Sequence, residues 1–117
     1  MAEQLLINRA HSTTTHIPGR ALNSVGVHHF IIDGSSSPKE EITPADAFLA
    51  SISACAVHLL ERFAQENGVP LHRAEAAIEG IRRADDPANF QAVNLRLELL
   101  GPDQSQAEEL VERFKAR

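Results

Sequence analysis

Residues 43–68 predict one long helix, because the stretch carries both a start signal and a stop signal. Thr43 is a favourable N-cap residue, and Pro44 suits the first helical position. Asn67 and Gly68 end the pattern, and a helix rarely continues past such a pair. At about 1.5 Å per residue, residues 44–66 span about 34 Å, the width of a small domain. The rest of the chain is therefore expected to be organised around this helix.

The faces of this helix differ in polarity when residues are placed 100° apart. One apolar stripe is formed by Ala45, Phe48, Ile52, Ala56, Leu59 and Phe63. Ser51, His58 and Arg62 form a polar column beside it, and Cys55, the only cysteine, lies on the boundary. The first half of the helix is small and apolar nearly all round, which predicts that it is enclosed.

Length and charge limit the possible classes of protein. A chain of 117 residues is one domain with a modest core, so burial across a homodimer interface is expected. The net charge of -5 and the lack of a basic stripe argue against nucleic-acid binding. No run is long enough to indicate a membrane span or a signal peptide. One cysteine allows no intramolecular disulfide and predicts a cytoplasmic location.

The segments before the helix predict strands. Residues 4–9 and 26–33 are apolar runs, and the β-branched threonines at 13–15 begin another strand. A polar loop over 35–42 connects to the helix cap.

The segments after the helix predict a hairpin and a last helix. Residues 92–100 alternate between apolar and polar side chains, as a half-buried strand does. Residues 73–83 fit either a strand or a helix, and we choose a strand that pairs with 92–100 across a turn at 85–87. Asp103 or Ser105 caps the last helix. The order of elements predicts an α+β fold.

Four motifs give the chain a resemblance to a known family. They are T-P-A-D at 43–46, A-S-I-S-A-C at 50–55, N-G-V-P-L at 67–71 and E-E-L-V-E-R-F-K at 108–115. In this order and spacing, residues 26–117 resemble the OsmC/Ohr family of osmotically induced and organic-hydroperoxide-resistance proteins. The resemblance implies an OsmC-like α+β fold over residues 1–117. In this fold, an antiparallel sheet packs around a long central helix in an intertwined homodimer.

The resemblance also implies a chemistry for Cys55. Active members of the family reduce small organic hydroperoxides with a helical peroxidatic cysteine, a resolving cysteine and an external thiol reductant. Cys55 matches the first, and Arg20 is the candidate for the early-loop arginine that holds the thiolate. Two positions depart from the pattern: Ala45 stands where a glutamate is usual, and no second cysteine is present. Either the C-terminal part of the fold is missing or this is a one-cysteine member.

Two interpretations of Cys55 follow. A thiolate could attack the terminal peroxide oxygen, giving a sulfenic acid and an alcohol, with Phe48 and Ile52 favouring an alkyl substrate. Alternatively, Cys55 is an inert core residue, since free cysteine is among the most buried residue types. The chain would then be a catalytically degenerate member that binds a small apolar molecule or serves only as a structural dimer.

The six histidines do not predict a metal site. His28 and His29 are adjacent on a predicted strand and therefore point to opposite faces. His58 and Cys55 are one helical turn apart, but no third ligand is placed by spacing, and zinc needs at least three. No phosphate-binding loop or dinucleotide motif is present. We therefore expect no metal and no cofactor.

Overall fold

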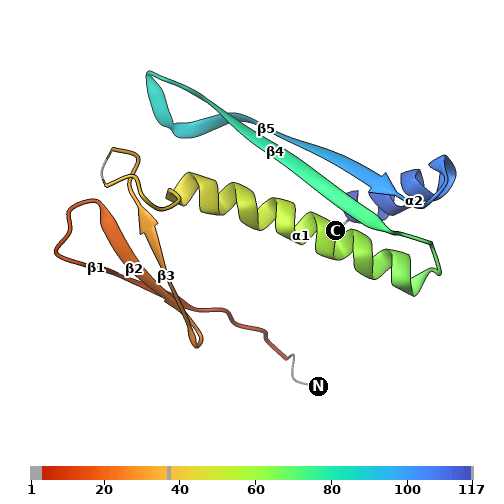
Figure 1. Ribbon diagram of the computed structural model, residues 1–117, viewed down its shortest axis with the longest axis horizontal. Helices are drawn as coiled ribbons and strands as arrows, with labels where there is room; N and C mark the ends of the chain where they lie inside the picture. Colours follow the sequence, from red (N-terminus) through yellow and green to blue (C-terminus); the bar gives the residue numbers. More distant parts are fainter. Residues whose placement is uncertain (1–3, 37, 117) are drawn as a thin grey trace. The chain divides into compact units, whose positions relative to one another are not determined.

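The computed structural model describes residues 4–36 and 38–116 (Figure 1). Ser37 of the predicted polar loop and Arg117 at the C-terminus lie outside these residues. Three strands, a long helix, two further strands and a short helix follow one another along the described chain. The chain divides after Ala47 into two compact units. Antiparallel strands and a long helix confirm the predicted α+β class.

The first unit contains a three-stranded antiparallel sheet in the order β1-β2-β3. Its strands are β1 (Ala10–Thr14), β2 (Arg20–Val25) and β3 (His28–Asp33). Gly26 begins the two-residue loop between β2 and β3 with a φ of +59°, which a side chain would disfavour. The resulting register places Arg20 directly opposite Asp33.

Two strand predictions in this unit need correction. The predicted strand at 4–9 is wrong: these residues have no regular structure, and Leu6 is 99% exposed. The threonine-rich segment belongs to β1, which ends at Thr14, and β2 was not predicted. The sequence of β2 does not alternate, and the strand forms because β1 and β3 pair with it on both sides. β3 starts at His28, because Gly26 is used for the turn.

The long helix α1 (Pro44–Glu66) has the predicted bounds. The Oγ1 atom of Thr43 accepts a hydrogen bond from the Asp46 backbone N–H at 3.2 Å, and the Asp46 carboxylate accepts one from the Thr43 N–H at 3.2 Å. This reciprocal pair is a capping box, with a carboxylate at the positive end of the helix dipole. Gly68 ends the helix in the left-handed region, with a φ of +63°.

The second unit contains the rest of α1, a long hairpin and a short helix. The hairpin pairs β4 (Arg73–Arg83) with β5 (Asp86–Leu100), and it runs alongside α1 (Figure 1). The choice of a strand for residues 73–83 is therefore confirmed, and β5 begins six residues earlier than the predicted 92–100. Asp103 is the N-cap of helix α2 (Gln104–Lys115), and its side chain accepts from the Gln106 N–H in a second capping box.

The hydrophobic core lies at the C-terminal end of α1. Leu60, Phe63 and Ala64 of α1 pack with Leu110 of α2, and all four are buried. Residues that pack around them are Leu59, Val69, Leu71, Ala74, Leu97, Leu99 and Phe114. Part of the predicted stripe is wrong, since Phe48 is 52% exposed while Leu60 and Ala64 are buried. The expected enclosure of the first half of α1 is also not found within this chain.

Helix α1 is long and apolar enough to cross a membrane, judged by length and composition alone. The prediction that no segment has that length is therefore wrong. The central helix of a soluble protein passes the same test. Four side chains of α1 are buried in this fold, all of them in the second half of the helix.

Candidate functional site

Cys55 lies in the middle of α1 and is exposed within this chain. Ser51 stands one turn before it and His58 one turn after it, and both are exposed. The Ser51 Oγ donates to the Phe48 carbonyl oxygen at 2.7 Å. Arg62 points elsewhere: its guanidinium pairs with Glu66 at 3.8 Å and lies over the Phe63 ring. Ser51 and His58 of the predicted polar column therefore lie beside Cys55 on the exposed helix surface. The Arg62 guanidinium instead contacts Glu66 and Phe63 near the C-terminal end of the helix.

An aromatic cluster lies on the same side of α1 as Cys55. Phe48 precedes Cys55 by seven residues, so the two side chains lie within about 20° of each other around the helix axis. The Phe48 ring stacks on Phe90 of β5, with centroids 5.9 Å apart and an interplanar angle of 21°. The guanidinium of Arg82 lies 5.5 Å from the centre of the Phe90 ring, in cation–π geometry.

Gly80 of β4 makes room for the Phe90 ring. A Cβ atom at this position would lie 2.3 Å from Cε1 of Phe90, far inside van der Waals contact. The absence of a side chain therefore lets the ring cover the strand and meet Phe48. Phe90 and Arg82 were not predicted as site residues, because the cross-strand contact depends on an irregular register near the hairpin turn.

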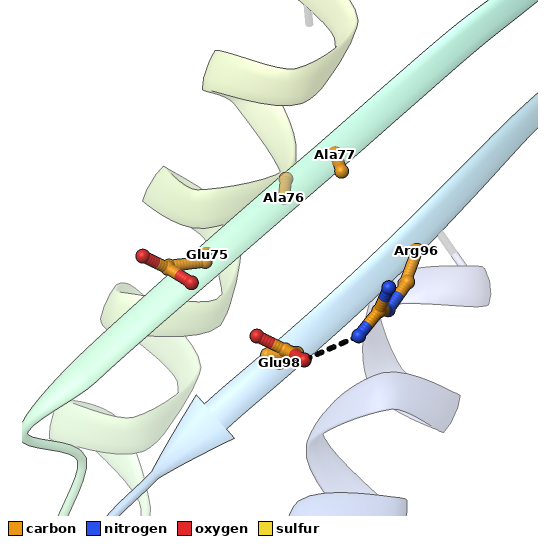
Figure 2. A pocket seen from close by; sticks show the side chains of 5 residues that line it. All are labelled: Glu75, Ala76, Ala77, Arg96 and Glu98. Carbon is orange, nitrogen blue, oxygen red and sulfur yellow. Dashed lines mark hydrogen bonds and ion pairs between the residues drawn. The ribbon is translucent and has the colours of Figure 1, made fainter.

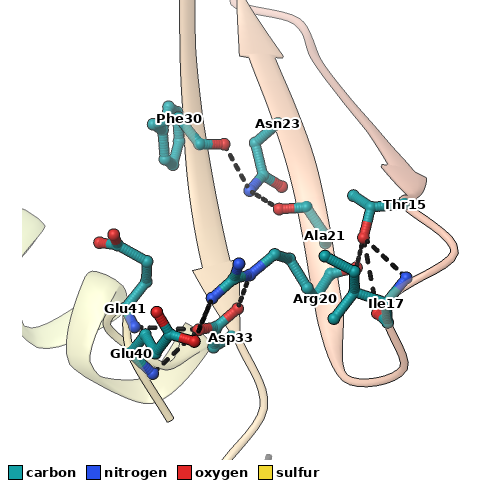
Figure 3. Close-up of polar contacts among 9 residues, drawn as sticks. All are labelled: Thr15, Ile17, Arg20, Ala21, Asn23, Phe30, Asp33, Glu40 and Glu41. Atoms are coloured by element: carbon teal, nitrogen blue, oxygen red, sulfur yellow. Dashed lines mark hydrogen bonds and ion pairs between the residues drawn. The ribbon is translucent and has the colours of Figure 1, made fainter. Parts of the chain in front are cut away.

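Arg20 and Asp33 form a polar cluster in the first unit, shown in Figure 3. Arg20 donates from Nε to Oδ1 of Asp33 at 2.8 Å and from Nη2 to Oδ2 at 2.9 Å. The backbone N–H groups of Glu40 and Glu41 donate to Oδ2 at 3.1 and 2.9 Å. Asp33 is fully buried, while the Arg20 side chain is 19% exposed. One carboxylate therefore joins β2, β3 and the segment that precedes α1.

The hydrogen bonds from Arg20 lower the pKa of Asp33 to about 2, and those from the Glu41 and Glu40 backbone act in the same direction. Burial acts against them, because it disfavours the charged carboxylate. The same pair raises the pKa of Arg20 above its usual value. The guanidinium and the carboxylate thus both stay charged throughout the physiological range.

Acid is expected to destabilise the fold through Asp33. Its pKa is lower in the folded chain than in the unfolded chain, so the unfolded chain binds more protons between about pH 4 and pH 2. The contribution of Asp33 to the free energy of unfolding is complete above about pH 4 and is lost as the pH falls toward 2. Urea unfolding at several pH values measures it. Asp33→Asn should lack this component, and an unchanged acid dependence in that variant would contradict the assignment.

The two predicted site residues lie in different units. Cys55 belongs to the second unit, which starts at Phe48, and Arg20 belongs to the first, which ends at Ala47. Arg20 is the first residue of β2 and not part of a loop. Asp33 was missed as a partner for Arg20, although a hairpin around Gly26 would have placed the two opposite each other. Glu40 and Glu41, which lie in the predicted polar loop, hold Asp33 through their backbone N–H groups.

The outer face of the hairpin carries a surface pocket lined by Glu75, Ala76, Ala77, Arg96 and Glu98 (Figure 2). Arg96 pairs with Glu98 at 2.6 Å, and Glu75 pairs with Arg73. Glu75 and Glu98 are opposite each other in the ladder, and the two arginines offset their repulsion. All four charged side chains are exposed, so this face is a solvated sheet surface with no arrangement for catalysis.

Residues 4–36 and 38–116 contain no group of three or more His, Cys, Asp or Glu side chains that could hold an ion. His29 lies with its Nδ1 2.8 Å from the Ser24 Oγ, which gives that ring a partner on the neighbouring strand.

The chain matches a known protein family and resembles several solved structures. The family of OsmC-like proteins matches residues 35–117. An OsmC-like protein from Mycoplasma pneumoniae has a TM-score of 0.81 and 15% identity, over 96% of this chain and 82% of its own. An organic hydroperoxide resistance protein OsmC from Legionella pneumophila has a TM-score of 0.74 and 18% identity, covering 97% and 85%.

A third solved structure, an organic hydroperoxide resistance protein of Bacillus subtilis, has a TM-score of 0.65 and 19% identity, over 97% of this chain and 86% of its own. No curated protein sequence matches the chain. At these identities, the likeness to solved structures establishes the fold alone. The family match, however, spans most of the sequence, and it starts in the segment before α1 and continues through α2. The chain therefore belongs to the OsmC family.

Proposed function

We propose that this OsmC-family protein reduces organic hydroperoxides through Cys55, with an external thiol as the reductant. The observation that carries the proposal is an accessible thiol on α1, on the same side as the Phe48–Phe90 cluster. The exposure of Cys55 within the single chain supports a reactive thiol over an inert core residue. Two of the solved structures with this fold are named organic hydroperoxide resistance proteins, which supports the same class of substrate.

The first step is a nucleophilic attack. The Cys55 thiolate attacks the terminal oxygen of the hydroperoxide, a sulfur–oxygen bond forms, and the oxygen–oxygen bond breaks. The alkoxide leaves with a proton as the alcohol, and Cys55 becomes a sulfenic acid once protonated. Phe48 and Phe90 offer an apolar surface to the organic group, which hydrogen peroxide lacks.

External thiols complete the cycle, because Cys55 is the only cysteine in the chain. One thiol condenses with the sulfenic acid to give a mixed disulfide and water. A second thiol then releases the Cys55 thiol and leaves as an external disulfide. Arg20 is the cation we propose for stabilising the thiolate, since it keeps its charge throughout and holds a fixed conformation. A chain that depends on a free thiol fits the reducing cytoplasm.

Sulfenic-acid trapping tests the proposal. The protein is mixed with one equivalent of cumene hydroperoxide in the presence of a dimedone-type trap, and its intact mass is measured. We expect rapid, stoichiometric addition of one trap molecule at Cys55. Hydrogen peroxide, used at the same concentration, should react more slowly. An unmodified protein after prolonged exposure would refute the proposed function.

A homodimer is the proposed assembly. Large apolar side chains that are more than half exposed in the single chain are Leu5, Leu6, Ile7, Val27, Phe48 and Leu100. Such a density of exposed apolar side chains favours burial against a second copy. Light scattering at micromolar concentration should give twice the 12.8 kDa mass of one chain. A mass of one chain under these conditions would contradict the dimer.

A second candidate function is favoured by the substitution at Ala45, where the family resemblance implies a glutamate. A member without that carboxylate could bind a small apolar molecule without turning it over. In that case apolar ligands would raise the melting temperature of the protein, and no thiol would support hydroperoxide consumption.

A further inference from the structure

Cys55 has one neighbour on α1 that can exchange a proton near neutral pH, and it is His58. Residues three or four positions apart on a helix are neighbours, and for Cys55 these are Ser51, Ile52, His58 and Leu59. Of these four, only the imidazole takes up and releases a proton between about pH 5 and pH 8. Cys55 and His58 are both exposed, so neither is covered by the rest of its own chain.

Helix geometry brings the two side chains together. The spacing of three residues places their Cβ atoms about 5–6 Å apart, and it turns His58 by about 60° from Cys55 around the helix axis. Side chains on a helix lean toward its N-terminus, so the imidazole leans over the preceding turn, which carries Cys55. At this spacing the ring reaches the thiol directly or through one water molecule. Because both residues belong to α1, the arrangement depends on no other part of the chain.

Ser51 and Arg62, the other two members of the polar column, are engaged elsewhere. The Ser51 Oγ donates its proton to the Phe48 carbonyl oxygen at 2.7 Å. The Arg62 guanidinium pairs with Glu66 at 3.8 Å. A guanidinium also keeps its protons throughout the physiological range, so it cannot act in turn as a base and an acid. His58 is therefore the member of the column that can move a proton at the thiol.

A surface pocket of about 190 Å³ borders His58 and defines the charged groups that face its ring. These groups are Glu61 of α1, and His72 and Arg73 from the segment that follows the helix. Arg73 pairs with Glu75, which offsets its charge. His72 lines the same pocket and is also exposed, but it lies outside α1. It is therefore a matched control for His58.

We propose that His58 is the acid–base residue of the reaction at Cys55. The proposal rests on the function proposed above and names the group that moves the proton. A ring nitrogen of His58 takes the proton of the Cys55 thiol, and the thiolate attacks the terminal oxygen of the hydroperoxide. The sulfur–oxygen bond forms as the oxygen–oxygen bond breaks, and the imidazolium gives its proton to the leaving alkoxide. The sulfenic acid and the alcohol then carry the two protons that the thiol and the hydroperoxide carried at the start, and the imidazole is neutral again.

The test compares two reactions of the same thiol. Oxidation by cumene hydroperoxide needs a proton for the leaving alkoxide, whereas alkylation by iodoacetamide releases iodide, which needs none. Both rates are measured at neutral pH from the loss of free thiol, which reports on Cys55 alone because the chain has one cysteine. The variants are His58→Ala and the control His72→Ala. Alanine favours a helix and position 58 is exposed, so His58→Ala should keep its fold, which circular dichroism checks.

We expect the ratio of the oxidation rate to the alkylation rate to fall by about a hundredfold in His58→Ala, a typical contribution of a general acid. The ratio removes the fraction of thiolate, on which both rates depend. Imidazole added to the buffer should restore part of the oxidation rate of His58→Ala and leave its alkylation rate unchanged. His72→Ala should keep the wild-type ratio. A purely structural role for His58 would change both rates together and would not respond to imidazole.

Three results would overturn the proposal, and they differ in what they leave standing. If the hydroperoxide oxidises the wild type and His58→Ala keeps the wild-type ratio, His58 moves no proton in the reaction, and the proposed function stands. An equal fall of the ratio in His72→Ala would mean that the charge around the pocket sets the rate, and not proton transfer by His58. If the wild type does not react with the hydroperoxide, the proposed function and this proposal both fail.

Discussion

Serine at position 55 is expected to abolish thiol-dependent consumption of an organic hydroperoxide while the fold is retained. The hydroxyl group is far less acidic than a thiol and cannot cycle through a sulfenic acid. Because Cys55 is exposed, the loss of sulfur should leave the packing unchanged. Peroxide consumption with dithiothreitol as the reductant measures activity, and circular dichroism with a thermal melt checks the fold. Consumption by Cys55→Ser equal to that of the wild type would exclude Cys55 as the peroxidatic residue.

The position of the thiol can be tested on the same helix. The double variant Cys55→Ser with Ser51→Cys moves the sulfur one turn toward the N-terminus of α1, still on an exposed part of the helix. If the site around Cys55 has a specific geometry, the moved thiol should restore little of the activity. Full recovery would mean that any exposed thiol of this helix reacts, and the aromatic cluster would then have no part in the reaction.

The helices could be predicted because their ends are determined locally. Thr43 and Asp46 cap each other across three residues, and so do Asp103 and Gln106. Gly68 ends α1 within its own turn. Such signals need no knowledge of the tertiary fold, and both predicted helices have the expected bounds or starts.

The first sheet was harder to predict because its pairing is not local. Residues 4–9 and 20–25 each contain three apolar side chains, yet only the second segment forms a strand. It does so because it lies between two partners in a three-stranded sheet. Likewise, the buried face of α1 depends on where α2 and the hairpin pack, and this contact selects Leu60 in place of Phe48. Periodicity within one segment does not contain that information.

In the candidate site, too, the residues with a local signal could be predicted and those that depend on long-range pairing could not. Cys55 is found from the sequence because it is the only thiol and because its helix resembles that of a known family. Arg20 was proposed by resemblance, but its partner Asp33 depends on the register of the β2–β3 hairpin, thirteen residues apart. Phe90 needs both the absence of a side chain at Gly80 and a contact with Phe48. Residues that act through long-range pairing are therefore the ones that a pattern along the chain does not reveal.

Leu60→Ala is expected to produce the largest loss of stability. Leu60 is fully buried and packs with Phe63, Ala64 and Leu110, so truncation removes apolar contacts and leaves a cavity. Substitutions of this kind lower the free energy of unfolding by about 2–5 kcal/mol. Domains have only about 5–15 kcal/mol in total, so the variant should be close to unfolding at elevated temperature. Urea unfolding, followed by circular dichroism at a fixed protein concentration, measures the change.

Leu100→Ala is the matched control, because it removes the same atoms from a residue of the same unit that is 64% exposed. Substitutions at exposed positions usually change the free energy of unfolding by about 0.5 kcal/mol or less. A small effect of Leu100→Ala and a large effect of Leu60→Ala on the free energy of unfolding would establish the core at the C-terminal end of α1. An equally large effect at Leu100 that depends on protein concentration would show that a second copy covers this end of β5, since dimer stability follows mass action. Equal effects without that dependence would contradict the assignment of the core.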